Sequence, residues 1–216
     1  MLLMASIVLN SCSTCRINRL KNKSYKEWKA FQWTETKKSS DQKAADWTIY
    51  SRKVEGTTLM EYKIEGEIGS SPETCMAAFR QGIHHQAENP GKKYPAYEIV
   101  HESQDSLLTY VIHNEPFPFK DTEMRVQYLF INNEDCSMGV SWNEAWDRGS
   151  TPPSKKLKRI ETFRGSWQFS TVSEKQSNAV NMVQFDPQGM PKWLVQPMVT
   201  KFLRDGLENI RAAASK

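Results

Sequence analysis

The chain has 216 residues, about one and a half times the usual domain length, which predicts one large domain. A composition of 38% hydrophobic and 25% charged residues argues against intrinsic disorder, and no run of about 18 apolar residues predicts a membrane-spanning helix. The 29 basic and 25 acidic residues leave a net charge of +4 spread along the chain, without the concentrated basic face that nucleic-acid binding needs.

The start of the chain differs from the rest. Residues 1–9 are apolar and uncharged, and residues 9–12 (LNSC) resemble a bacterial lipobox, a signal in which the cysteine, here Cys12, is lipidated and becomes the new N-terminus. The resemblance implies a leader and tether over residues 1–24 and one folded domain over residues 25–216. It also implies a lipid-anchored or periplasmic protein of the cell envelope. The alternative is a cytoplasmic protein whose first residues are disordered or come from a wrongly assigned start codon.

Strand signals occupy most of the chain. Eight segments show the strand pattern, bounded by turn residues. These segments are residues 47–53, 59–68, 96–103, 107–113, 124–132, 137–147, 160–172 and 179–186. The short connections between consecutive strands favour antiparallel pairing, because parallel neighbours need crossovers of a dozen or more residues.

Helical segments complete the pattern. A short amphipathic helix is predicted over residues 25–31. Another begins after Ser71, an N-cap followed by proline at the first helical position, and covers residues 72–82, with a second helical piece reaching Glu88. A long helix closes the chain over residues 191–214. Its apolar positions recur every three or four residues, at Leu194, Met198 or Val199, Phe202 or Leu203, Leu207 and Ile210.

These elements predict an α+β architecture, in which a curved antiparallel sheet is covered by one long amphipathic helix. Pro197 predicts a kink near the first turn of that helix. A large sheet around a single helix leaves interior space unless bulky side chains fill it, and the chain has seven Trp. A packed aromatic core and a hollow core lined with aromatic residues are both compatible with the sequence.

Three segments resemble the START family (StAR-related lipid transfer domains). Residues 116–121 (PFPFKD) are similar to its proline–aromatic–proline connection, residues 163–169 (FRGSWQF) to its Gly-x-Trp strand, and residues 186–195 (DPQGMPKWLV) to the segment that opens its final helix. The resemblance implies a helix-grip fold (START/Bet v 1-like), whose sheet wraps around the long C-terminal helix and encloses a tunnel for one hydrophobic molecule. The family's Arg-Asp after the first segment is Thr122-Glu123 here, so an ion pair at that place is not carried over.

The resemblance further implies binding, and transfer, of a lipid or other hydrophobic small molecule by a monomer with peripheral membrane contact. A non-catalytic role is expected, and an aromatase/cyclase-like enzyme of the same fold is the alternative. No cofactor or metal is expected, because the four histidines lack metal-site spacing and no nucleophile or phosphate-loop motif occurs. Cys75 is expected to be a small buried side chain, although pairing with Cys136 is the alternative.

The candidate ligand-binding residues come from strands, one loop and the last helix. Glu144 is the lone charge on a face that also carries Trp142 and Trp146, so it is either a polar anchor for a ligand head group or part of an ion pair with Arg159 or another nearby cation. Tyr128 brings a hydroxyl group into an apolar row. The full set is Phe117, Phe119, Tyr128, Trp142, Glu144, Trp146, Arg159, Trp167, Met198 and Phe202.

Phe117 and Phe119 stand between prolines in a predicted loop. They either insert among acyl chains and gate an opening, or fold inward as part of the core. A basic cluster at Lys155, Lys156, Lys158 and Arg159 is either a contact for an anionic membrane or a solvated loop.

Overall fold

The structure is a computed structural model, and it describes residues 32–39, 47–115, 117, 119–133, 136–146, 156–186 and 192–215. The strands are β1 (Thr34–Lys38), β2 (Trp47–Lys53), β3 (Met60–Ile68), β4 (Ala96–Glu102), β5 (Ser106–His113), β6 (Thr122–Asn132), β7 (Met138–Glu144), β8 (Lys158–Arg159), β9 (Phe163–Ser173) and β10 (Gln176–Phe185). The helices are α1 (Pro72–Glu88) and α2 (Lys192–Ala214). The helix expected over residues 25–31 lies outside the described residues.

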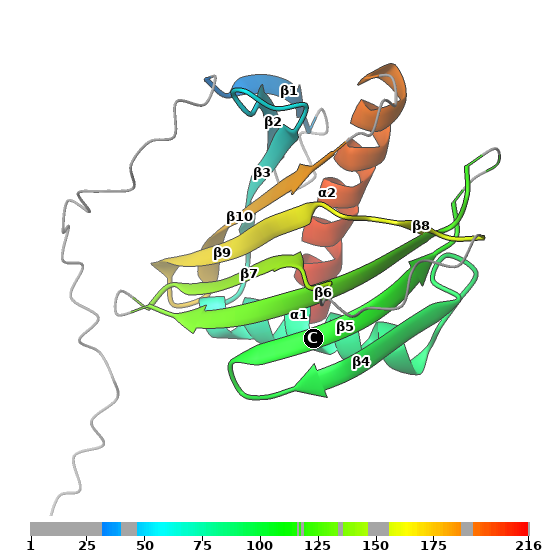
Figure 1. Ribbon diagram of the computed structural model, residues 1–216. Helices are drawn as coiled ribbons and strands as arrows, with labels where there is room; N and C mark the ends of the chain where they lie inside the picture. The colour runs from blue at the N-terminus through cyan, green and yellow to red at the C-terminus, as the bar shows by residue number, and fades with distance from the viewer. Residues whose placement is uncertain are drawn as a thin grey trace, which may run out of the picture.

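The strands form one curved sheet in the order β1-β2-β3-β10-β9-β7-β6-β5-β4. Every neighbouring pair along this order is antiparallel, and the short β8 pairs in parallel with the start of β6. Figure 1 shows the sheet curving around α2, with α1 across its lower end. This is the helix-grip architecture expected from the sequence, and it places one face of the sheet against both helices, here called the inner face.

The sequence located most strands to within a few residues, and β2 has the predicted bounds. Two strands were not predicted. β1 (TETKK) has no apolar residue, and β8 has only two residues, so neither carries the alternation that marks a strand.

The expected break in the first long helix is wrong, because α1 runs without interruption from Pro72 to Glu88. Its start is the predicted one, with the Thr74 amide donating to the Ser71 hydroxyl at 3.3 Å. Ile83 is buried and continues the apolar face of α1 beyond the expected end. Packing of that face outweighs the low helix propensity of Gly82.

The core lies between the inner face and α2. On α2 the buried residues include Leu203, Leu207 and Ile210, and Val199 packs against the same core. Met198 and Phe202 are 41% and 42% exposed, so the structure selects Val199 and Leu203 from the alternatives that the sequence left open. No helix within the described ranges is long and apolar enough to cross a bilayer.

Candidate functional site

Five aromatic side chains from the inner face and the two helices are in successive ring contact, here called the aromatic row. The ring of Tyr128 in β6 lies 6.0 Å from Phe79 in α1 and 6.1 Å from Trp142 in β7, between ring centroids. Phe163 in β9 follows at 6.2 Å from Trp142, and Phe202 in α2 at 6.4 Å from Phe163. These spacings fall within the range for aromatic pairs, and the row joins α1 to α2 across β6, β7 and β9.

Strand pairing explains how the row forms. Tyr128 and Trp142 lie directly opposite each other in the β6–β7 ladder, so their side chains share one face. Trp142 is in turn opposite Gly165 in β9, and a Cβ atom at position 165 would lie 2.3 Å from Trp142 Cζ2. The indole ring therefore occupies the space that a side chain at position 165 would need.

Members of the row differ in burial. Trp142 is 5% exposed, whereas Phe79, Tyr128 and Phe163 are only partly buried and Phe202 is 42% exposed. These four rings therefore keep apolar surface that the described residues leave uncovered. The row thus presents apolar surface, and it includes three of the sequence-predicted residues, Tyr128, Trp142 and Phe202.

Hydroxyl groups of neighbouring strands lie next to the aromatic row at Tyr128. Burial raises the pKa of Tyr128 to about 12, and the Tyr97 hydroxyl in β4 lies beside the Tyr128 hydroxyl. Burial likewise raises the pKa of Tyr97. The Thr109 hydroxyl in β5 lies beside Tyr128 without reaching standard hydrogen-bond geometry, and Thr109 Oγ1 and Trp142 Nε1 are buried with no partner within the described residues.

Glu144 is held by an ion pair with Arg164, not with Arg159. Arg164 Nε lies 3.1 Å and 3.2 Å from the two carboxylate oxygens, and the Phe163 amide donates to Glu144 at 3.3 Å. Burial raises the pKa of this carboxyl, but these hydrogen bonds outweigh burial and lower the pKa overall. Glu144 is therefore one partner of a structural ion pair that links the end of β7 to the start of β9.

Trp146 and Arg159 lie elsewhere than predicted. Arg159 Nε donates to Glu123 at 2.9 Å, and Glu123 belongs to the alternate set of β6 residues, on the face opposite to Tyr128. The Arg159 guanidinium also stacks on the Trp146 ring at 3.9 Å. Strand β7 ends at Glu144, so the two-residue period that was to bring Trp146 beside Trp142 does not continue that far.

Trp167 is a core residue. It is 3% exposed and stacks on Phe169 with a centroid distance of 5.4 Å. A Cβ atom at Gly206 of α2 would lie 3.6 Å from the indole, so the helix packs closely on it. Of the loop residues, Phe117 is 98% exposed and Phe119 is 40% exposed, so neither is a buried core residue.

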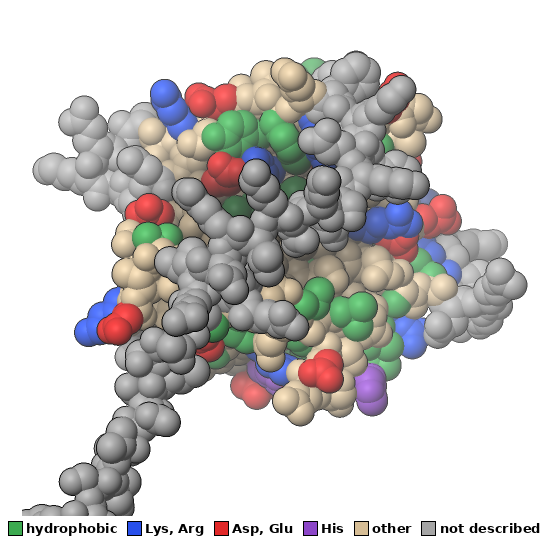
Figure 2. All heavy atoms as spheres, turned by 90° about the vertical axis from the view of Figure 1, so that its left-hand side faces the viewer, with side chains coloured by type: hydrophobic (Ala, Val, Ile, Leu, Met, Phe, Trp, Pro, Cys, Tyr) green, Lys and Arg blue, Asp and Glu red, His purple; other side chains and the backbone are tan. Residues whose placement is uncertain are grey.

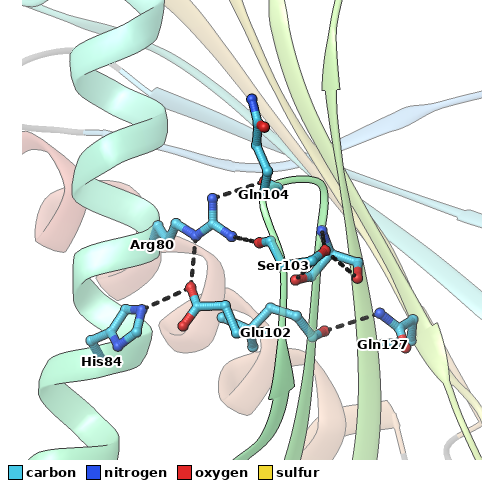
Figure 3. A network of polar contacts seen from close by, with 8 residues as sticks. Arg80, His84, Glu102, Ser103, Gln104 and Gln127 are labelled. Atoms are coloured by element: carbon cyan, nitrogen blue, oxygen red, sulfur yellow. Dashed lines mark hydrogen bonds and ion pairs between the residues drawn. The ribbon is translucent and has the colours of Figure 1, made fainter.

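A polar network fixes α1 to the turn between β4 and β5 (Figure 3). Arg80 Nε donates to Glu102 at 3.0 Å, Arg80 Nη1 donates to the Gln104 carbonyl at 3.0 Å, and Arg80 Nη2 donates to the Ser103 carbonyl. His84 Nε2 contacts the same Glu102 oxygen at 3.1 Å. The network positions Phe79, the neighbour of Arg80 in sequence, at one end of the aromatic row.

The remaining features give no other site. No group of His, Cys, Asp and Glu suited to a metal ion occurs in the described part of the chain. Cys75 is a buried free thiol and Cys136 is disulfide-bonded, so the two do not pair with each other. Figure 2 shows acidic and basic side chains interspersed on the face that it presents.

Solved structures share this architecture. The STAR-related lipid transfer protein from Xanthomonas axonopodis has a TM-score of 0.68 and 16% identity over 85% of this chain and 99% of that chain. The human StarD13 (DLC2) lipid transfer and protein localization domain has a TM-score of 0.66 and 12% identity over 84% of this chain and 88% of that chain. Human StAR-related lipid transfer protein 5 has a TM-score of 0.65 and 13% identity over 85% of this chain and 86% of that chain. No family model and no curated protein matched, so the likeness concerns the fold.

Proposed function

We propose that this protein binds a lipid or another hydrophobic small molecule along the aromatic row and carries it without catalysis. The observation that carries the proposal is the row itself, whose rings come from the sheet and both helices and, apart from Trp142, keep accessible surface. Ligand binding there would be driven by burial of apolar area, at about 25 cal/mol per Å². The lipid-transfer proteins of the same fold support this class of ligand.

Native mass spectrometry of the full chain, purified under mild conditions from a bacterial host, tests the proposal. The expected result is a bound lipid that dissociates on denaturation. The variant Phe202→Ser removes a ring that is already 42% exposed, so it should reduce the lipid recovered per mole of protein while leaving the fold intact. Val172→Ser, at a residue 52% exposed in β9 and outside the row, is the matched control. Protein that carries no lipid would contradict the proposal.

We propose in addition that the loop with Phe117 and Phe119 contacts the membrane during ligand exchange. Phe117 is 98% exposed, which is unfavourable for a large apolar ring in water and favourable for insertion between lipids. The base of the loop is fixed, because the Glu115 amide donates to Asp121 at 3.1 Å and Thr122 donates to Glu115 at 3.0 Å. Phe117→Ser should lower co-sedimentation with phosphatidylglycerol vesicles, and Val100→Ser, 48% exposed in β4, should not.

We also propose lipidation at Cys12 and a place in the cell envelope, from the lipobox-like residues 9–12, which lie outside the described residues. Intact mass spectrometry of protein from a bacterial host is the test. A diacylglyceryl adduct on a chain that begins at Cys12 supports the anchor, and a chain that retains Met1 contradicts it. We expect the mature protein to be monomeric, which sedimentation measures directly.

A further inference from the structure

The cysteines of the chain leave one disulfide to be assigned. They are Cys12, Cys15, Cys75 and Cys136. Cys136 is disulfide-bonded, and Cys75 is a buried free thiol in α1. The partner of Cys136 is therefore Cys12 or Cys15, which both lie outside the described residues. Either pairing links the start of the chain to the turn between β6 and β7.

The structure presents Cys136 for such a bond. It lies in the turn between β6 and β7 and is exposed. The Cys136 amide donates to the Asn133 carbonyl at 3.1 Å, and the Asn133 amide donates to the Ser137 carbonyl at 2.9 Å, so the turn is fixed by its own hydrogen bonds. The backbone of Cys136 has a φ of 59°, in the left-handed region that glycine or asparagine adopts more easily. The turn alone therefore does not favour cysteine at this position.

The chemistry of lipidation decides between the two partners. In a lipidated cysteine the sulfur carries the diacylglyceryl group through a thioether bond, so it has no thiol left to oxidise. Lipidation at Cys12, as proposed above, leaves Cys15 as the partner of Cys136. We infer that Cys15 and Cys136 form a disulfide. The inference rests on the proposed lipidation at Cys12 and assigns the second cysteine of the same segment.

Formation of this bond is an oxidation. The Cys15 and Cys136 thiols lose two protons and two electrons, and a disulfide oxidant of the cell envelope takes them up by thiol–disulfide exchange and becomes a dithiol. Structural disulfides persist in oxidising compartments such as the bacterial periplasm. The envelope location that the lipobox-like residues imply therefore supplies the conditions that the bond needs.

The bond shortens the connection between the lipid anchor and the folded domain. Without it, the chain from Cys12 to the start of β1 at Thr34 spans at most about 75 Å when fully extended. With it, the chain from Cys12 to Cys15 spans at most about 10 Å, and the disulfide adds about 6 Å between Cα atoms. The turn between β6 and β7 is then held next to the membrane that carries the anchor.

Counting free thiols by mass spectrometry tests the inference. The full chain is produced in a bacterial host, its free thiols are blocked with N-ethylmaleimide in denaturant without reductant, and the adducts are counted. The lipidated wild type should carry one adduct, on Cys75. Cys15→Ser and Cys136→Ser should each carry one adduct more than the wild type, because each variant releases the partner thiol. Cys75→Ser is the matched control and should carry one adduct fewer.

Fragmentation of the linked tryptic peptide separates this inference from the proposed lipidation. Trypsin leaves Cys12 and Cys15 in one peptide that ends at Arg16, and its fragment masses show which sulfur is joined to the peptide with Cys136. Linkage at Cys15 supports the inference even in a chain that retains Met1, a result that overturns the lipidation alone. Linkage at Cys12 overturns both proposals. Absence of a linked peptide overturns the inference whatever the state of Cys12.

Discussion

Replacing Gly165 by alanine tests whether the aromatic row depends on the close approach of Trp142 to β9. The added Cβ atom would lie 2.3 Å from Trp142 Cζ2 and 2.4 Å from the carbonyl oxygen of Met182. The indole must then move by about 1 Å or more to reach an ordinary contact distance. The Met182 carbonyl is backbone within β10, so it cannot give way cheaply on the other side.

The expected cost follows from these contacts. Overpacking of a core costs about 1–3 kcal/mol. A displaced Trp142 also loses part of its ring contacts with Tyr128 and Phe163, each worth about 0.5–1.5 kcal/mol. We therefore expect Gly165→Ala to lower the free energy of unfolding by about 3 kcal/mol, which lowers Tm by about 6–12 °C in a chain of this length.

Circular dichroism and tryptophan fluorescence during thermal unfolding measure the change. Gly139→Ala is the matched control, because its Cβ atom would lie 3.5 Å from the Trp167 carbonyl, an ordinary contact, in the same strand as Trp142. Equal values of Tm for the two variants would refute the close packing of Trp142 against Gly165.

Three further predictions concern stability and local opening. Leu203→Ala should reduce the free energy of unfolding by about 2–5 kcal/mol and Met198→Ala by no more than about 0.5 kcal/mol in urea titrations, and similar losses would contradict the assigned face of α2. Because the folded-state pKa of Glu144 is lowered, its pair with Arg164 stabilises the fold above the unfolded pKa and is lost as the pH falls through the folded pKa. Glu144→Gln should therefore reduce the dependence of Tm on pH between about pH 5 and pH 3, and an unchanged acid profile would contradict this. Arg80→Ala should speed amide hydrogen exchange in the β4–β5 turn but not in the β9–β10 turn, and equal exchange in both turns would show that the network does not hold α1.

The sequence predicted the fold well because the elements that determine it carry strong local signals. Strand β2 begins with the alternating residues Trp47, Thr48 and Ile49, and α1 begins with an N-cap and a proline that are visible in the sequence. The missed strands lack such signals. β1 is polar throughout and is held by pairing with β2, a contact between segments that no local pattern of β1 records.

The candidate site was only partly predictable. Tyr128 and Trp142 follow from strand alternation, because each lies inside a long strand. Phe79 and Phe163 were not chosen, since the row joins α1, β7 and β9, whose proximity is a property of the tertiary structure. Phe163 does share its face with Gly165 in the two-residue period of β9, and that signal would have located it. Trp146 was misplaced because alternation was extended past the end of the strand.

The pairing of β3 with β10 has a consequence for how the chain is made. Ile68 lies opposite Ser177, so β3, which pairs with β2 along one edge, finds the partner of its other edge only after most of the chain has left the ribosome. Such distant pairing raises the relative contact order, which slows folding. Until then the edge of β3 that will bind β10 stays uncovered, and a nascent chain in that condition is a natural client for a chaperone.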